Sequence, residues 1–267
     1  MIRVRAALAE DYGAFAQLVP ELGAGGPVPG ETHWATDLAK QSLVAESNGS
    51  VVGYLVGGTA GRCGQVHQLV VDPQQRRQGI AQLLLAAFAG RLREAGCTSW
   101  QLNVEGHNAA ARALYERSGF RLQRRSDWVE VQAEALTDLP RDATLVGRLV
   151  TPAEDEAIEA RFDLPVAAMR WFRTIGGAAL VAVDARDEAR SFGVWLQEKR
   201  LVRPLRLDRA AALPALLAPV APAGTITLVL EEGLPELIEA LHAAGGTTVM
   251  QEYRYVGELP TAPPAAT

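Results

Sequence analysis

One segment of the chain joins a predicted strand to a predicted helix through residue types that suit an anion. Residues 65–82 read QVHQLVVDPQQRRQGIAQ, with a turn that contains Gly79 between the apolar strand and the apolar helix. The first amides of a helix have no partner within it and carry the positive end of its dipole. Gly79 and the small Ala81 let an anion approach these amides, and Arg76 and Arg77 add positive charge. The turn predicts a phosphate or diphosphate site; an ordinary helix start with a packing glycine is the alternative.

A second helix is predicted after the next strand, where residues 108–120 read NAAARALYERSGF. Asn108 is a favourable helix N-cap, and Gly119 ends the helix. Together the two segments resemble the GNAT superfamily of acetyl-CoA-dependent N-acetyltransferases. R-x-x-G-x-A at residues 76–81 fits the diphosphate loop of that family, and N-x-x-A-x-x-L-Y-x-x-x-G-F at residues 108–120 fits its downstream helix. The resemblance covers about residues 1–131 and includes the order of the strands.

The resemblance implies a binding site for acetyl-CoA as co-substrate. The strand end at residues 69–71 would bind the pantetheine arm through its backbone, and the turn at residues 77–82 would wrap the diphosphate. Asn108 would contact the cofactor near its thiol end. Tyr115 would be the general acid that protonates the departing thiolate, and a core tyrosine is the alternative. The implied cofactor-binding residues are Leu69, Val70, Val71, Arg76, Arg77, Gln78, Gly79, Ile80, Ala81, Gln82, Asn108 and Tyr115.

The general base stays open at the level of sequence. Many relatives place a carboxylate where this chain has Gln65 or Asn103, and a neutral amide cannot take a proton at neutral pH. Glu105 and His67 are the nearest candidates, although a hydrogen-bonded strand histidine is an alternative for His67. An amine that is already neutral would need no base. Further residues that suit the base or the acceptor site are His107, Glu31 and His33.

The first half of the chain alternates between strands and helices. Asn48-Gly49 predicts a hairpin, because both residues tolerate positive φ. A glycine- and proline-rich loop is expected at residues 23–30. Apolar periodicity predicts strands at residues 2–5, 42–47, 51–57, 65–71, 99–104 and 120–131, and helices at 9–19, 80–95 and 108–118.

The second half can be laid on the first, with Gly193 on Gly53 and Asp208 on Asp72. Strands are expected at residues 178–183, 191–197, 201–207, 225–230 and 247–256, and a helix at 235–244. From Asp72 to Trp100 there are 28 residues, whereas from Asp208 to Ile226 there are 18, so the stretch that would hold the diphosphate turn is shorter. Leu234 and Leu241 stand where the first half has Asn108 and Tyr115. A chance α+β resemblance is the alternative to a repeat.

The predicted fold class is therefore α/β (α+β), namely a GNAT fold with a mixed, mostly antiparallel sheet flanked by helices, in two tandem copies. We expect a catalytic GNAT domain at residues 1–133 and a linker at 134–142. A degenerate GNAT-like domain without the cofactor loop would follow at 143–258, and a disordered tail at 259–267.

Composition narrows the class of protein further. The chain has 267 residues, 48% of them hydrophobic, and a net charge of −5, which disfavours nucleic acid as a partner. Two cysteines and no metal-ligand spacing among four histidines exclude a disulfide scaffold and predict no metal. No apolar run is long enough for a membrane span and no secretory signal is visible, so we expect no membrane partner and a cytoplasmic location.

The function implied is an N-acetyltransferase that moves an acetyl group from acetyl-CoA to a primary amine by direct attack. The acceptor would be a small-molecule amine or a peptide N-terminus, and the protein a monomer or homodimer. A non-catalytic acyl-CoA-binding sensor and an enzyme acting on protein N-termini are the alternatives.

Overall fold

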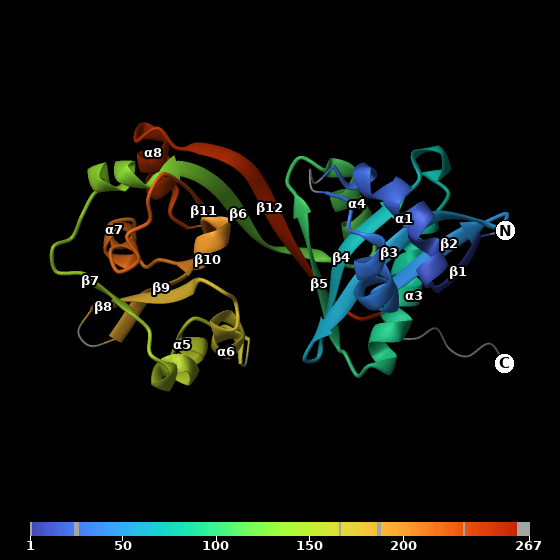
Figure 1. Cartoon of the computed structure of the whole chain (residues 1–267), viewed down its shortest axis with the longest axis horizontal. Coiled ribbons are helices and arrows are strands. Elements are labelled where there is room, and N and C mark those ends of the chain that lie inside the picture. Colours follow the sequence, from blue (N-terminus) through green and yellow to red (C-terminus); the bar gives the residue numbers. More distant parts are fainter. Residues whose placement is uncertain (1, 24–26, 166, 186–187, 232, 261–267) are drawn as a thin grey trace. The chain divides into compact units, whose positions relative to one another are not determined.

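The computed structural model describes residues 2–23, 27–165, 167–185, 188–231 and 233–260. The chain divides into two compact units (Figure 1). Unit 1 comprises Met1–Gln123 and Tyr253–Thr267, and unit 2 comprises Arg124–Glu252. The first unit therefore takes its last strand from the end of the chain, and the dividing point lies ten residues before the boundary expected at 134.

Unit 1 is a sheet with helices on both faces, as the alternation of strands and helices predicts (Figure 1). Its sheet order is β1-β2-β3-β4-β5 followed by the end of β12. The strand pairs β1–β2, β2–β3 and β3–β4 are antiparallel, whereas β4 lies parallel to β5. Its elements are β1 (Ile2–Ala6), α1 (Tyr12–Leu18), α2 (Glu31–His33), β2 (Ser42–Ser47), β3 (Ser50–Ala60), β4 (Cys63–Val71), α3 (Ile80–Glu94), β5 (Ser99–Glu105) and α4 (Ala109–Arg117).

Asn48 and Gly49 turn the β2–β3 hairpin with φ of 51° and 82°, as expected.

Glycines place α3, the principal helix of unit 1, close to its sheet. A Cβ at Gly57 would lie 2.4 Å from the ring of Phe88, and one at Gly64 would lie 2.2 Å from Leu92. Because these two positions lack side chains, α3 packs directly on β3 and β4, and its N-terminus is held at the end of β4.

Two strands exchange between the units. β6 (Arg121–Gln132) follows α4, yet its residues from Arg124 onward belong to unit 2, where it pairs antiparallel with β11. β12 (Thr247–Glu258) follows the last helix of unit 2, and its residues from Tyr253 onward belong to unit 1 beside β5. Periodicity predicts both strands but not their partners.

Unit 2 repeats the element order of unit 1, and β10 pairs parallel with β11 as β4 does with β5. Its sheet order is β12-β6-β11-β10-β9-β8-β7. Four of its elements, β7, α5, α6 and α7, are not predicted from the sequence. Its elements are β7 (Val146–Leu149), α5 (Asp155–Arg161), α6 (Ala168–Arg173), β8 (Ala178–Ala185), β9 (Glu188–Leu196), β10 (Leu201–Arg206), α7 (Ala212–Leu217), β11 (Thr225–Glu231) and α8 (Pro235–Ala243).

An ion-pair triad supports the first strand of unit 1. Arg5 of β1 lies 2.7 Å from Asp11 and 2.6 Å from Glu46 of β2. Asp11 also accepts a hydrogen bond from the Leu8 amide at 2.7 Å, so it caps the turn that follows β1. Glu46 pairs across the ladder with Arg3, two residues before Arg5.

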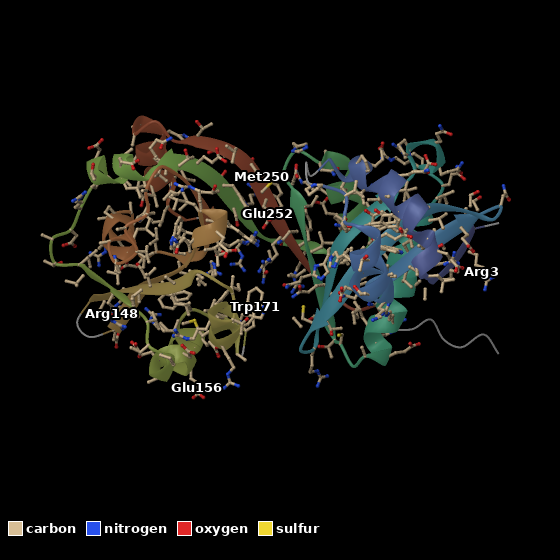
Figure 2. The ribbon with its side chains drawn as sticks, viewed as in Figure 1. Arg3, Arg148, Glu156, Trp171, Met250 and Glu252 are labelled. Atoms are coloured by element: carbon tan, nitrogen blue, oxygen red, sulfur yellow. The ribbon has the colours of Figure 1, made fainter. Side chains whose placement is uncertain are left out.

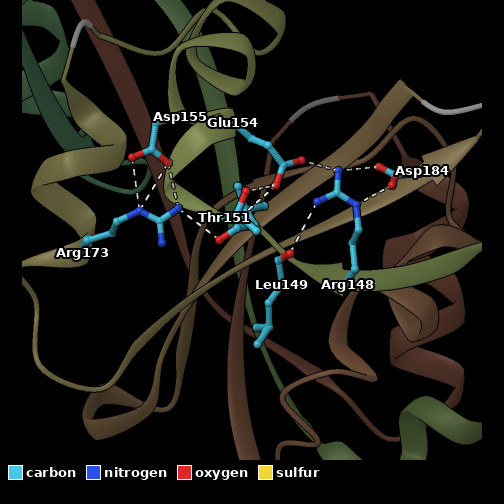
Figure 3. A network of polar contacts seen from close by, with 8 residues as sticks. Arg148, Leu149, Thr151, Glu154, Asp155, Arg173 and Asp184 are labelled. Carbon is cyan, nitrogen blue, oxygen red and sulfur yellow. Dashed lines mark hydrogen bonds and ion pairs between the residues drawn. The ribbon is translucent and has the colours of Figure 1, made fainter.

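The same triad occurs in unit 2 (Figure 3). Arg148 of β7 contacts Asp184 of β8 and lies 2.6 Å from Glu154. Glu154 accepts from the Thr151 amide at 2.8 Å and so caps the turn after β7. Asp184 pairs across the ladder with Val146, again two residues before the arginine. Arg5 to Asp11 and Arg148 to Glu154 are both six residues apart, so the repeat extends to specific side chains.

Side chains fill the interiors of both units (Figure 2). Glu252, labelled there, is the last residue of unit 2 and accepts from Arg203 at 2.8 Å. Beyond it, the Leu259 amide donates to the Thr98 carbonyl at 3.1 Å, and Arg93 donates to the Pro260 carbonyl at 2.7 Å. The rest of the expected tail, residues 261–267, lies outside the described residues.

Helices long and apolar enough to cross a bilayer do not occur in the described part of the chain. Within the same residues, no group of three or more His, Cys, Asp or Glu side chains is arranged to hold a metal ion.

Candidate active site

A cavity of about 430 Å³ lies in unit 1 where β4 and β5 part. The two strands pair in parallel only from Cys63–Ser99 to Val66–Leu102, and both continue beyond that point. The end of β4, the turn into α3 and one face of α4 form its walls. The lining residues are Glu21, Leu69, Val70, Val71, Gln75, Arg76, Arg77, Gly79, Ile80, Ala81, Gln82, Asn108, Ala110, Ala111, Leu114, Tyr115 and Arg117.

The turn between β4 and α3 has an unusual backbone. Arg77 and Gly79 both adopt positive φ, 67° and 79°. This conformation is uncommon for a residue with a Cβ, and strained residues of this kind gather at ligand sites. α3, which is 15 residues long, begins directly after Gly79, and this N-cap residue has no side chain to accept from the first amides. Ile80, Ala81 and Gln82, the first three residues of α3, line the cavity. The turn is therefore suited to an anion.

Arg76 braces this turn. Its Nε donates to the Val71 carbonyl at 3.0 Å, and its Nη2 lies 2.8 Å from Glu21 Oε2. Glu21 belongs to a 3₁₀ turn at Val19–Leu22 and also lines the cavity. Arg76, whose positive charge is expected from the sequence to attract an anion, is therefore partly neutralised by the carboxylate of Glu21.

α4 brings the two other expected residues to the cavity. Asn108 caps the helix, since its Oδ1 accepts from the Ala111 amide at 3.0 Å. Tyr115 lies two turns later and is 8% exposed. Burial raises the pKa of Tyr115 to about 12, so its hydroxyl keeps its proton at neutral pH. The ring of Phe120 meets that of Tyr115 edge-on at 5.8 Å.

The candidate bases lie outside the cavity lining among the described residues. His67 is exposed on β4, and desolvation lowers its pKa, so it is neutral at pH 7. Glu105 lies 3.4 Å from His107, with its side chain 33% exposed. Asn103 accepts a hydrogen bond from Arg254 Nε at 3.1 Å. The three other candidates, Gln65, Glu31 and His33, also lie outside the lining.

Eleven of the twelve expected cofactor residues line the cavity. The twelfth, Gln78, donates to Gln75 at 3.2 Å instead. Sequence reasoning missed Arg117 and Ala110, although helical spacing places Ala110, Leu114 and Arg117 in one row beside Asn108, Ala111 and Tyr115. It also missed Gln75 and Glu21. No sequence pattern indicates that Glu21 belongs to the site, because Glu21 lies 55 residues before Arg76 along the chain.

Comparison with known proteins agrees with this arrangement. Residues 6–120 match the model of the Acetyltransferase (GNAT) family. Acetyltransferase SG1711 of Sodalis glossinidius is 38% identical over 81 residues, which are 30% of this chain. The match spans only 57% of the length of that relative.

The fold of the whole chain is that of solved GNAT proteins. A GCN5-related N-acetyltransferase from Sphaerobacter thermophilus aligns with a TM-score of 0.65 and 16% identity, covering 100% of this chain and 98% of that one. A tandem GNAT protein from the clavulanic acid biosynthesis pathway aligns at 0.60 and 17% identity, covering 98% and 100%. The expected fold class, two tandem GNAT copies, is confirmed.

Unit 2 has a smaller cavity at the matching place in its GNAT fold. A volume of about 210 Å³ lies where β10 and β11 part, lined by Leu205, Arg206, Leu207, Asp208, Leu230, Glu231, Gly233 and Leu234. α7, which follows β10, has only six residues, against 15 in α3. Leu234 stands at the N-cap of α8 and makes no side-chain cap, and Leu241 is fully buried. Asp208 accepts from the buried Ser191 hydroxyl at 3.0 Å.

Proposed function

We propose that unit 1 transfers an acetyl group from acetyl-CoA to a primary amine, without a covalent enzyme intermediate. The observation that carries the proposal is the single cavity that gathers the end of β4, the left-handed turn, Asn108 and Tyr115. Acetyl-CoA would supply the acetyl group as a thioester.

The residues present fit this co-substrate. Main-chain amides at the start of α3, beside Arg77 and Gly79, would bind the diphosphate. The backbone at residues 69–71 pairs with β3 but no longer with β5, so its groups on the β5 side, apart from the Val71 carbonyl that accepts from Arg76, would be open to the pantetheine arm. An amide there would also stabilise negative charge on the thioester oxygen. Asn108 and the small Ala111 would line the path of the arm on α4.

Tyr115 would donate its proton to the departing thiolate. Its pKa of about 12 makes it a weak acid that is protonated throughout the working pH range. His67, neutral because of its lowered pKa, and the partly buried Glu105 are the candidates for proton acceptance, directly or through water. Neither lines the cavity among the described residues, which favours an acceptor amine that loses its proton to solvent.

We assign unit 2 a structural or acceptor-shaping role without a cofactor of its own. Its shorter α7, the leucine at the N-cap of α8 and the smaller cavity support this assignment. A panel of amines distinguishes a small-molecule acceptor from a peptide N-terminus.

The decisive experiment is a panel of amines scored by release of free CoA thiol. Polyamines, amino acids, aminoglycosides and peptides would each be supplied with acetyl-CoA. Stimulation above the rate without amine, by at least tenfold for one class, is the expected result. Slow hydrolysis that no amine accelerates, together with tight acetyl-CoA binding, would instead identify a sensor.

A further inference from the structure

We propose that Tyr255, contributed by the last strand of the chain, is a positioning residue for the catalytic helix α4 of unit 1. The proposal rests on the role proposed for Tyr115, because its consequence is a correctly placed phenol. Tyr255 lies outside residues 6–120, the segment that matches the family model.

The first step of the argument is the contact of Tyr255 with α4. Tyr255 is fully buried, and its hydroxyl donates to Glu116 Oε1 at 2.7 Å. Glu116 is the neighbour of Tyr115 on the helix. The rings of Tyr115 and Tyr255 lie 6.5 Å apart, so Tyr255 also packs against the candidate acid itself. One side chain therefore fixes the helix by a charge-assisted hydrogen bond and limits the space in which Tyr115 can turn.

A second contact holds the other end of α4. The guanidinium of Arg112 lies 4.7 Å above the ring of Tyr253, two residues before Tyr255 on β12. Arg112 Nη1 donates to the Gly106 carbonyl at 3.0 Å. Gly106 belongs to the turn that leads to Asn108. Tyr253 thus contacts the first half of α4 through Arg112, while Tyr255 contacts both Arg112 and Glu116, next to Tyr115.

The last part of β12 lies close to the residues that follow α4. A Cβ at Gly257 would lie 2.9 Å from Trp100 Nε1 and 3.2 Å from the Gly119 carbonyl, directly after α4. The absence of a side chain at Gly257 lets β12 lie against the end of the helix. The hydrogen bond from the Leu259 amide to Thr98 continues the attachment.

The test is the full-length variant Tyr255→Phe, which keeps the ring and removes the hydroxyl. We expect kcat to fall three- to tenfold, with the Kd for acetyl-CoA changed less than twofold and protection of α4 amides from hydrogen exchange reduced about tenfold. Glu116→Ala should reproduce these effects, and the double variant should be no worse than either single one. Glu116→Gln, which keeps an acceptor oxygen, should restore most of kcat. Val249→Ala, on the exposed part of the same strand, is the control.

Three results would overturn the proposal. The first is a lowered melting temperature with unchanged kcat and unchanged α4 protection. The second is a loss of acetyl-CoA affinity as large as the loss of kcat, since the whole site would then have loosened. The third is full additivity of the two single variants. If Tyr115→Phe leaves kcat unchanged, the acid role fails by itself, and hydrogen exchange still decides whether Tyr255 positions α4.

Discussion

The two units retain one part of their common fold and differ in the other. Arg5, Asp11 and Glu46 in unit 1 correspond to Arg148, Glu154 and Asp184 in unit 2. Each arginine lies six residues before the first carboxylate, and the second carboxylate pairs across the ladder with the residue two positions before the arginine. These triads hold the first two strands and the turn between the first strand and first helix.

The difference lies at the other end of the sheet. Unit 1 has a left-handed turn and a 15-residue helix after β4, whereas unit 2 has a six-residue helix after β10. Asn108 and Tyr115 face the cavity of unit 1, and leucines stand at the matching positions of unit 2. The contacts that maintain the sheet are thus separable from the features that line the cavity of unit 1.

The largest effect should come from Gly79→Val. A β-branched residue is strained at a φ of 79° and would place a side chain on the turn, so we expect acetyl-CoA to bind at least a hundredfold more weakly. Gly245→Val in unit 2, where φ is 86°, carries similar strain and is the matched control. Calorimetry should give one acetyl-CoA per chain for the wild type and for Gly245→Val. Two sites would break the contrast between the units.

Tyr115→Phe should lower kcat about ten- to a hundredfold, because it removes the proton donor while keeping the ring. The Kd for acetyl-CoA should change less than twofold. Tyr12→Phe removes a hydroxyl from unit 1 outside the cavity lining and should leave kcat near that of the wild type. Steady-state kinetics with the best amine measures both, and an unchanged kcat for Tyr115→Phe would remove its assigned role.

The two triads should differ in strength. Arg5→Met leaves Asp11, whose side chain is 6% exposed, without its partner and should cost about 1–2 kcal/mol of stability. Arg148→Met should cost less, because Glu154 and Asp184 are 30% and 29% exposed. Denaturant unfolding measures both free energies; a larger loss for Arg148→Met would contradict the burial argument.

These triads also predict the pH dependence of stability. The hydrogen bond from Arg5 holds the pKa of Asp11 below its usual value of 3.8, so this contribution is present above that pH and is lost as the pH falls through the lowered pKa. The acid-induced loss should be smaller in Arg5→Met.

Arg117→Ala should have the smallest effect. Arg117 lines the cavity on α4, and its removal should weaken acetyl-CoA binding three- to tenfold and reduce the dependence of Kd on salt. Arg121→Ala removes the same charge from an exposed position outside the lining. Titrations at two salt concentrations distinguish the variants, and equal losses would show that only net charge matters.

Much of the site is readable from local sequence. Gly79 and Asn108 act through backbone geometry and capping, which depend on residues within one helical turn. The helical spacing of Asn108, Ala111 and Tyr115 places them on one face. β7, α5, α6 and α7 were missed, because these elements have four to seven residues and give little periodicity.

The sequence alone determined the order of strands and helices in unit 1, the turn after β4 and the capped start of α4, because each depends mainly on residues close along the chain. The tertiary structure decided which strand completes unit 1, where Glu21 meets Arg76, and how Tyr255 reaches Glu116 across 139 residues. Those contacts form only when distant segments are brought together by burial, and neither periodicity nor spacing encodes which segments meet.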